Sequence, residues 1–134
     1  MTHLLVTNPC IRYLNGQSPR LRERIDAAGP ELLAVCSIVK AELHFGALKS
    51  QAQVRTLSLQ QHFLSRFKSL PFDDAAASAY GRIRSELERR GTPNGANDLM
   101  IAAIAITNRL TLVTHNVGEF SRIADLQVED WEAE

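Results

Sequence analysis

The chain has 134 residues, with 15 Lys and Arg against 15 Asp and Glu, and a formal net charge of zero. This length suits one domain, residues 1–134, with a sizeable core. Two cysteines, Cys10 and Cys36, are too few for a disulfide scaffold and favour a reducing compartment. No apolar run approaches the roughly 20 residues of a membrane span, and no signal peptide opens the chain. We therefore expect a cytoplasmic protein that does not contact a membrane.

The neutral total conceals an uneven distribution of charge. Residues 125–134 hold five acids and no Lys or Arg, which leaves 15 basic and 10 acidic residues in positions 1–124, a balance of +5. Twelve of the 15 basic residues are Arg, whose guanidinium forms forked contacts with phosphate and carboxylate. The sequence is therefore compatible with a nucleic-acid partner. The alternative is a basic body with a solvated acidic tail.

The first half of the chain alternates short apolar runs with helical patterns. Residues 3–6 predict a strand that leads into a helix with Asn8 as N-cap and Pro9 at the first helical position. The next predicted elements are a helix from Ser18-Pro19 to about residue 29, a strand over 32–36, a helix capped by Ser37 that ends near residue 48, and a long helix over 51–69. The candidate packing positions of the helix after Ser37 are Ile38, Ala41, Leu43, Phe45 and Leu48.

The second half continues this alternation. Residues 70–72 form a brief extended piece, and Asp73-Asp74 opens a helix that Gly91 stops. A turn-rich segment then leads to a buried, Ala-rich helix over 98–108, a strand over 110–114, a loop or short helix over 115–122, and an extended piece over 126–131. Short apolar strands separated by helices predict a single-domain α/β sandwich with a mostly parallel sheet.

Three carboxylates have positions that would bring them to the carboxyl edge of such a sheet, where ligands gather. Glu42 lies in the first turns of the helix after the second strand, Asp98 opens the Ala-rich helix, and Glu119 follows the strand over 110–114. Oxygen ligands of this kind suit Mg²⁺ or Mn²⁺. Each acid also has an ordinary interpretation, as a solvated helix charge, a charge at a helix N-terminus or a loop charge.

Several motifs together resemble the PIN-domain ribonucleases, specifically the VapC-type toxins of toxin–antitoxin pairs. The matching segments run in the expected order from residue 4 to residue 131, so the resemblance covers nearly the whole chain. They are Leu5-Val6-Thr7-Asn8, Ala41-Glu42-Leu43, Leu70-Pro71-Phe72-Asp73, Tyr80-Gly81-Arg82-Ile83-Arg84, Asn97-Asp98-Leu99-Met100, Leu112-Val113-Thr114-His115-Asn116 with Glu119-Phe120, and Val128-Glu129-Asp130-Trp131.

The resemblance implies a PIN-like α/β/α sandwich and an endoribonuclease that depends on Mg²⁺ or Mn²⁺. Its substrates would be RNA such as tRNA or rRNA, and a cognate antitoxin would hold it inactive. By position, Glu42 and Asp98 would be catalytic acids that bind the metal, with Glu119 as a further acid. Thr7, Asn8 and Asn116 would support the metal or the scissile phosphate.

The chain departs from the family pattern at position 6, where Val6 stands in place of the first metal-binding Asp. Valine has no oxygen to offer a cation, so we expect impaired nuclease activity on an intact scaffold. One alternative is a catalytically dead PIN-fold module that binds antitoxin, and perhaps RNA, for autoregulation. Another is an unrelated flavodoxin-like domain, against which the lack of a Gly-rich phosphate loop after the first strand argues.

Further candidates concern binding surfaces. Arg82 and Arg84 could steer phosphate towards the pocket or receive acidic groups of an antitoxin, or they could belong to a solvated helix with ion pairs. The predicted helix over 51–69 has more apolar positions than one core face requires. It could form a homodimer or antitoxin surface, or simply pack on the helix before it.

Overall fold

The computed structural model describes residues 1–133, which form a three-layered α/β/α domain around a five-stranded parallel sheet of order β3-β2-β1-β4-β5. The predicted fold class is confirmed. The strands are β1 (His3–Leu5), β2 (Leu33–Cys36), β3 (Lys68–Leu70), β4 (Thr111–Val113) and β5 (Val128–Glu129). The helices are α1 (Thr7–Asn15), α2 (Pro19–Ala28), α3 (Ser37–Leu48), α4 (Gln53–Leu64), α5 (Asp74–Arg89), α6 (Ala96–Thr107) and α7 (Val117–Phe120).

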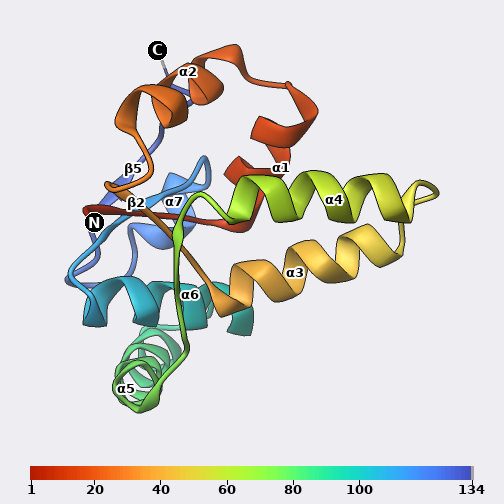
Figure 1. Ribbon diagram of the computed structural model, residues 1–134. Coiled ribbons are helices and arrows are strands. Elements are labelled where there is room, and N and C mark those ends of the chain that lie inside the picture. Colours follow the sequence, from red (N-terminus) through yellow and green to blue (C-terminus); the bar gives the residue numbers. More distant parts are fainter. Residues whose placement is uncertain (134) are drawn as a thin grey trace.

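Two pairs of helices enclose the sheet. In Figure 1, α1 and α2 lie on one side of the strands, and α5 and α6 lie on the other. The paired helices α3 and α4 project from this body. A parallel sheet covered on both faces requires strands that are apolar throughout, which the runs in β1 and β2 provide.

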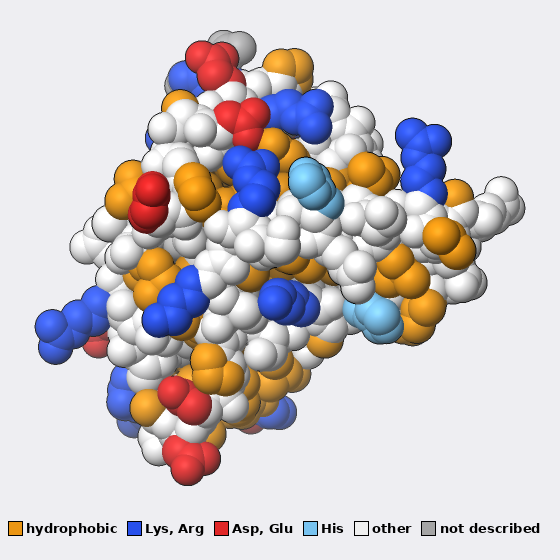
Figure 2. All heavy atoms as spheres, in the orientation of Figure 1, with side chains coloured by type: hydrophobic (Ala, Val, Ile, Leu, Met, Phe, Trp, Pro, Cys, Tyr) orange, Lys and Arg blue, Asp and Glu red, His pale blue; other side chains and the backbone are white. Residues whose placement is uncertain are grey.

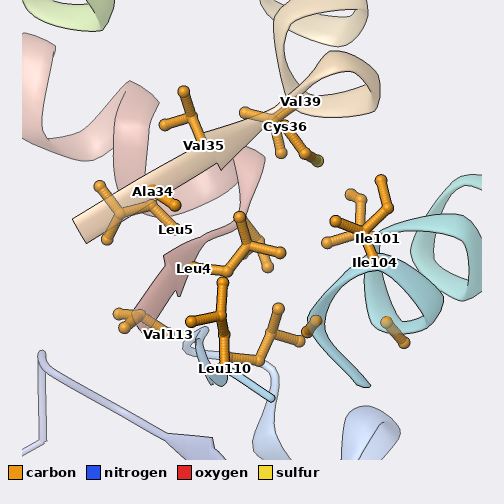
Figure 3. Close-up of a cluster of buried hydrophobic side chains, with 14 of the residues drawn as sticks. Leu4, Leu5, Ala34, Val35, Cys36, Val39, Ile101, Ile104, Leu110 and Val113 are labelled. Atoms are coloured by element: carbon orange, nitrogen blue, oxygen red, sulfur yellow. The ribbon is translucent and has the colours of Figure 1, made fainter. Parts of the chain in front are cut away.

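Strand β1 is the centre of the core. Leu4 pairs with Ala34 of β2 on one side and with Leu112 of β4 on the other. Leu4 and Leu5 are both fully buried, as expected for a strand enclosed on both faces. Figure 3 shows Ile101 and Ile104 of α6 directed toward the strands. The apolar contacts therefore fix the position of α6 relative to the carboxyl ends of β1 and β4.

Several helix boundaries follow the predicted capping signals. Ser18 is the N-cap of α2, and its hydroxyl accepts a hydrogen bond from the Leu21 amide at 3.3 Å. Asp73 caps α5 by accepting from the Ala76 amide at 2.9 Å. Gly16 ends α1 in the left-handed conformation, with φ of 67°, which a residue without a Cβ adopts at little cost.

Two predicted caps are wrong by one or two residues. Val6 and Cys36 are the N-caps of α1 and α3, so Asn8 and Ser37 are helical residues and not caps. Neither helix has a side-chain cap hydrogen bond. The reason is that each helix begins directly at the end of a buried strand, where strand pairing, and not a capping side chain, fixes the turn.

The predicted helix over 51–69 is also wrong in extent. Helix α4 ends at Leu64, and Lys68–Leu70 forms strand β3, which pairs with β2. In α3 the buried positions are Val39, Leu43 and Ala47, whereas Ala41, Phe45 and Leu48 of the predicted packing set are exposed. The helix thus presents a second, apolar face to solvent.

Within the described residues, the acidic C-terminal segment makes hydrogen bonds and ion pairs with the domain and is not merely solvated. Glu129 accepts hydrogen bonds from the indole of Trp131 at 2.9 Å and pairs with His3 at 3.1 Å. The indole bond, together with His3, lowers the pKa of the Glu129 carboxyl. Glu132 pairs with Arg12 of α1. Glu134 lies outside the described residues.

Cys10 and Cys36 are free and buried, as the cysteine count predicts, and burial raises the pKa of both thiols. Among the helices of residues 1–133, none is both long and apolar enough to cross a bilayer.

Candidate active site

A small cavity of about 120 Å³ opens at the carboxyl edge of the sheet. Parallel pairing places the ends of β1 and β4 side by side, with Leu5 opposite Val113. The segments that follow these strands therefore meet at one place. We call this cavity the acidic pocket; its lining residues are Val6, Thr7, Asn8, Glu42, Asp98, Ile101, Thr114, Asn116 and Phe120.

The pocket collects most of the predicted site residues from distant parts of the chain. Val6, Thr7 and Asn8 come from the end of β1 and the start of α1, and Glu42 comes from the second turn of α3. Asp98 is the third residue of α6, and Asn116 is the N-cap of α7. The structure thus brings these side chains together as the sequence predicted, although their chemical roles stay predictions.

Glu42 is held by two polar neighbours. The Thr7 hydroxyl donates a hydrogen bond to Glu42 Oε1 at 2.5 Å, and the Asn97 amide donates to Oε2 at 3.4 Å. These contacts come from α1 and α6, which both pack against α3. They fix the orientation of a carboxylate that would otherwise rotate freely.

Asp98 lies in a region of unbalanced negative charge. Partial burial raises the pKa of its carboxyl, and repulsion from Glu119 and Glu42 raises it further. A pocket of this kind favours a cation, because a positive charge among the carboxylates relieves both effects.

Glu119 lies at the edge of this arrangement. It does not line the pocket, but it is near enough to act on Asp98, and Asn116 donates a hydrogen bond to its Oε2. Asn94 donates to the Glu119 carbonyl at 3.2 Å, which ties α7 to the turn before α6. Asn116 therefore links Glu119 to the pocket wall.

Val6 is in the pocket wall, directly after β1, and is only 6% exposed. Its amide donates to the Val113 carbonyl at 3.3 Å, so the backbone position is fixed by the neighbouring strand. Val6, the first residue after β1, therefore presents an apolar side chain to the pocket.

The donor set fits a hard divalent cation, although incompletely. Glu42 and Asp98 offer carboxylate oxygens, and Thr7, Asn8 and Asn116 offer neutral oxygens. Within residues 1–133, the carboxylate oxygens of Glu42, Asp98 and Glu119 do not all lie within 4.8 Å of one another. Mg²⁺ is usually held by one or two carboxylates and keeps several waters, so it does not require all three acids as ligands.

Arg82 and Arg84 lie on α5, away from the acidic pocket. Arg84 donates to Glu88 at 2.9 Å and to the Tyr80 hydroxyl at 2.7 Å, which matches the alternative of a helix with ion pairs. Arg82 lines a separate hollow of about 220 Å³ beside Ile123 and Asp125. Among the described residues Arg82 has no ion pair, and its role in RNA binding stays a prediction.

Four residues near the carboxylates were not predicted as site residues. Thr114, which is buried at the end of β4, accepts a hydrogen bond from the Asn116 amide at 3.0 Å and shapes the turn that presents Asn116. Its position directly after a strand was the available signal. Ile101 and Phe120 form the apolar wall, and Asn97 contacts Glu42; a single sequence does not distinguish such residues from core or surface positions.

Comparison with known proteins agrees with this architecture. Residues 4–126 match the PIN domain family model. The tRNA(fMet)-specific endonuclease VapC of Salmonella typhimurium is 41% identical over 128 residues, which cover 96% of each chain. The chain therefore belongs to the PIN-domain family, among the VapC ribonucleases.

Solved structures of relatives have the same fold over nearly their whole length. DNA-bound VapBC from Salmonella typhimurium gives a TM-score of 0.92 at 40% identity and covers 98% of both chains. VapBC2 from Rickettsia felis, bound to a DNA fragment from its promoter, gives 0.91 at 37% identity and covers 98% of this chain and 99% of that one.

Proposed function

We propose that the chain is the toxin of a toxin–antitoxin pair, with an endoribonuclease site that uses Mg²⁺ or Mn²⁺ and that Val6 impairs. The observation that carries the proposal is the acidic pocket itself, where Glu42 and Asp98 face Thr7, Asn8 and Asn116 at the carboxyl edge of the sheet. RNA is the proposed substrate. tRNA is the first to test, because the Salmonella relative is described as specific for tRNA(fMet).

The pocket residues have separate tasks in hydrolysis of a phosphodiester. Asp98 and Glu42 would hold the cation, and Thr7 and Asn97 keep the Glu42 carboxylate in place. Asn8 and Asn116 are suited to contact the scissile phosphate, and Asn116 also positions Glu119. When bound, the cation lowers the pKa of a coordinated water and neutralises charge on the phosphate.

Val6 accounts for the proposed impairment. A carboxylate at this place would add an oxygen ligand next to Thr7, whereas the isopropyl group offers none and excludes water from that wall. Loss of one carboxylate ligand weakens metal binding and orientation of the attacking water.

An antitoxin is the proposed partner, and a second cavity supports it. This apolar groove, of about 360 Å³, lies between α1, α3 and α4; its lining residues are Ile11, Leu14, Asn15, Glu42, Leu43, Gly46, Ser50, Thr56, Leu59 and Gln60. Glu42 lines both the groove and the acidic pocket. A polypeptide in the groove would therefore reach a catalytic carboxylate and could block it.

The exposed surface agrees with a partner at this place. Figure 2 shows hydrophobic side chains gathered over the projecting helices α3 and α4. Phe45, Val54 and Leu59 are 64%, 84% and 48% exposed. Large apolar side chains that gather on a surface mark protein interfaces. The same surface could hold a second copy of the chain, so a homodimer is part of the proposal.

The test is RNA cleavage by this chain and by Val6→Asp, with Mg²⁺ or Mn²⁺ and tRNA as substrate. We expect cleavage by Val6→Asp and little or none by the chain itself, and loss of activity when Asp98→Asn is added to Val6→Asp. Cleavage by both forms at equal rates would mean that Glu42, Asp98 and Glu119 suffice and that Val6 does not impair the site.

A second candidate function is favoured by Val6 alone: a catalytically dead module that binds antitoxin for autoregulation. If neither the chain nor Val6→Asp cleaves RNA, and the chain binds antitoxin tightly, this second function is supported over the first.

A further inference from the structure

A second group of metal-binding side chains lies outside the acidic pocket. His115 follows β4, and Asp130 and Glu132 follow β5; because β4 and β5 pair in parallel, these segments emerge side by side. The ligand atoms of the three side chains all lie within 4.8 Å of one another. None of the three lines the acidic pocket or the apolar groove.

Each carboxylate in this group has one oxygen engaged by the protein and one directed at His115. Asp130 Oδ1 accepts the Glu132 amide at 2.9 Å, and Asp130 Oδ2 lies 3.0 Å from His115 Nδ1. Glu132 Oε1 accepts from Arg12, and Glu132 Oε2 lies 3.9 Å from His115 Nδ1. Engaged second oxygens of this kind orient carboxylates that bind metals.

Glu132 gives an independent indication of a ligand. Its side chain is only 7% exposed, and its Oε2 is buried without a hydrogen-bond partner among the described residues. A buried carboxylate oxygen without a partner costs free energy, and Arg12 offsets only part of it through the other oxygen. A cation between Glu132, Asp130 and His115 would satisfy this oxygen.

The ligand atoms of this group indicate which class of cation it would bind. One imidazole nitrogen and two carboxylate oxygens, with a position open to water, match the ligands of Zn²⁺ in proteins. Tetrahedral bonds of about 2.0–2.1 Å place ligand atoms about 3.3 Å apart, close to the separations of 3.0 and 3.9 Å from His115 Nδ1. Mg²⁺ strongly prefers oxygen, so the imidazole disfavours it here.

We propose that His115, Asp130 and Glu132 form a binding site for Zn²⁺ or a similar divalent transition-metal ion, separate from the acidic pocket. Arg12 orients Glu132 and so couples the site to α1. The bound ion joins the segment after β4 to the segment after β5 and fixes the C-terminal end of the domain.

The test measures Zn²⁺ binding at about pH 7.5 by competition with a chromogenic chelator. The proteins are the unaltered chain, His115→Ala, Asp98→Asn and the control His62→Ala, which removes an exposed histidine of α4. We expect one Zn²⁺ in the unaltered chain, in Asp98→Asn and in His62→Ala. His115→Ala should bind Zn²⁺ at least about 100-fold more weakly, because it loses a direct ligand.

Two further measurements distinguish this site from the acidic pocket. X-ray absorption of the bound Zn²⁺ should show one imidazole nitrogen at about 2.0–2.1 Å. Saturating Zn²⁺ should raise the Tm of the unaltered chain by roughly 5–10 °C and leave that of His115→Ala nearly unchanged. Equal Zn²⁺ affinity in the unaltered chain and His115→Ala, or loss of binding only in Asp98→Asn, would overturn the proposal.

Discussion

The Thr7 hydroxyl donates a 2.5 Å hydrogen bond to Oε1 of Glu42, across 35 positions of sequence. Thr7 is the first residue of α1 and Glu42 lies in α3, so one bond joins the helices that follow β1 and β2. Thr7 thus acts on the pocket through the position of Glu42. A carboxylate held in this way presents a fixed oxygen to a cation, which a freely rotating one does not.

Removal of the Thr7 hydroxyl should therefore weaken the site without unfolding the domain. In the Val6→Asp background, we expect Thr7→Val to reduce Mn²⁺ affinity and RNA cleavage by about 10–100-fold, the usual effect of losing a group that supports a metal ligand. Thr7→Ser is the matched control because it keeps the hydroxyl. Titration of cleavage rate with Mn²⁺ measures the effect, and equal rates for Thr7→Val and Thr7→Ser would contradict it.

Restoration of a carboxylate at position 6 should have opposite effects on stability with and without metal. In metal-free buffer we expect Val6→Asp to lower the free energy of unfolding by about 1–3 kcal/mol, since a charge replaces a buried apolar group beside Asp98 and Glu42. Mg²⁺ or Mn²⁺ should return that stability by binding the folded state. Thermal melts of both forms test this, and an equal metal response in both would exclude it.

The raised pKa of Asp98 predicts that Asp98→Asn, which removes the carboxylate charge, stabilises the folded domain by an amount that depends on pH. Because the folded-state pKa lies above the unfolded value, the proton on Asp98 stabilises the fold fully below the unfolded pKa, and this stability is lost as the pH rises through the folded pKa. In metal-free buffer at pH 7, Asp98→Asn should therefore melt at a higher temperature than the unaltered chain. The difference should disappear below about pH 4, the ordinary pKa of aspartate.

Burial predicts a large difference between two Leu→Ala substitutions. Leu5 is fully buried in the central strand, and Leu5→Ala should lower the free energy of unfolding by about 2–5 kcal/mol. Leu48→Ala, on the exposed face of α3, should cost less than about 1 kcal/mol. Urea denaturation measures both, and similar costs would contradict the assigned core.

The apolar groove predicts where an antitoxin binds. Leu59 lines the groove and is half exposed, so Leu59→Glu should weaken binding of the cognate antitoxin at least about 10-fold without a change in Tm. Leu32→Glu is the control, because Leu32 is similarly exposed, at 43%, and lies outside the groove and outside α3 and α4. Calorimetric titration measures the affinity; equal weakening by both substitutions would place the antitoxin elsewhere.

The sequence predicted most of the architecture because its signals were local. Apolar runs marked β1 and β2, Ser18 and Asp73 marked two helix starts, and the Ala-rich segment marked the buried α6. The extended piece predicted over 70–72 lies two residues earlier, as strand β3, since Lys68 and Ser69 are exposed and only pairing with β2 makes them part of a strand.

The site was predictable to the extent that the family motifs placed its residues. Glu42, Asp98 and Asn116 meet in one pocket as expected. The contact between Asn97 and Glu42, and the position of Thr114, depend on how distant segments pack, which no local pattern encodes. The cluster of His115 with Asp130 and Glu132 was missed for the same reason, because β5 had to pair with β4 before the three could meet.

The order of the strands also determines when the pocket can form during synthesis. Strand β1 is made first, yet its neighbour β4 is made more than 100 residues later, and Leu5 pairs with Val113 only then. A nascent chain that ends before β4 leaves one edge of β1 unpaired and has neither Thr114 nor Asn116 opposite Thr7. Contacts between segments so far apart form late and slowly. Val6 and Asn116 therefore come together only once residue 116 has left the ribosome, and a nascent chain that ends before this residue has no complete acidic pocket.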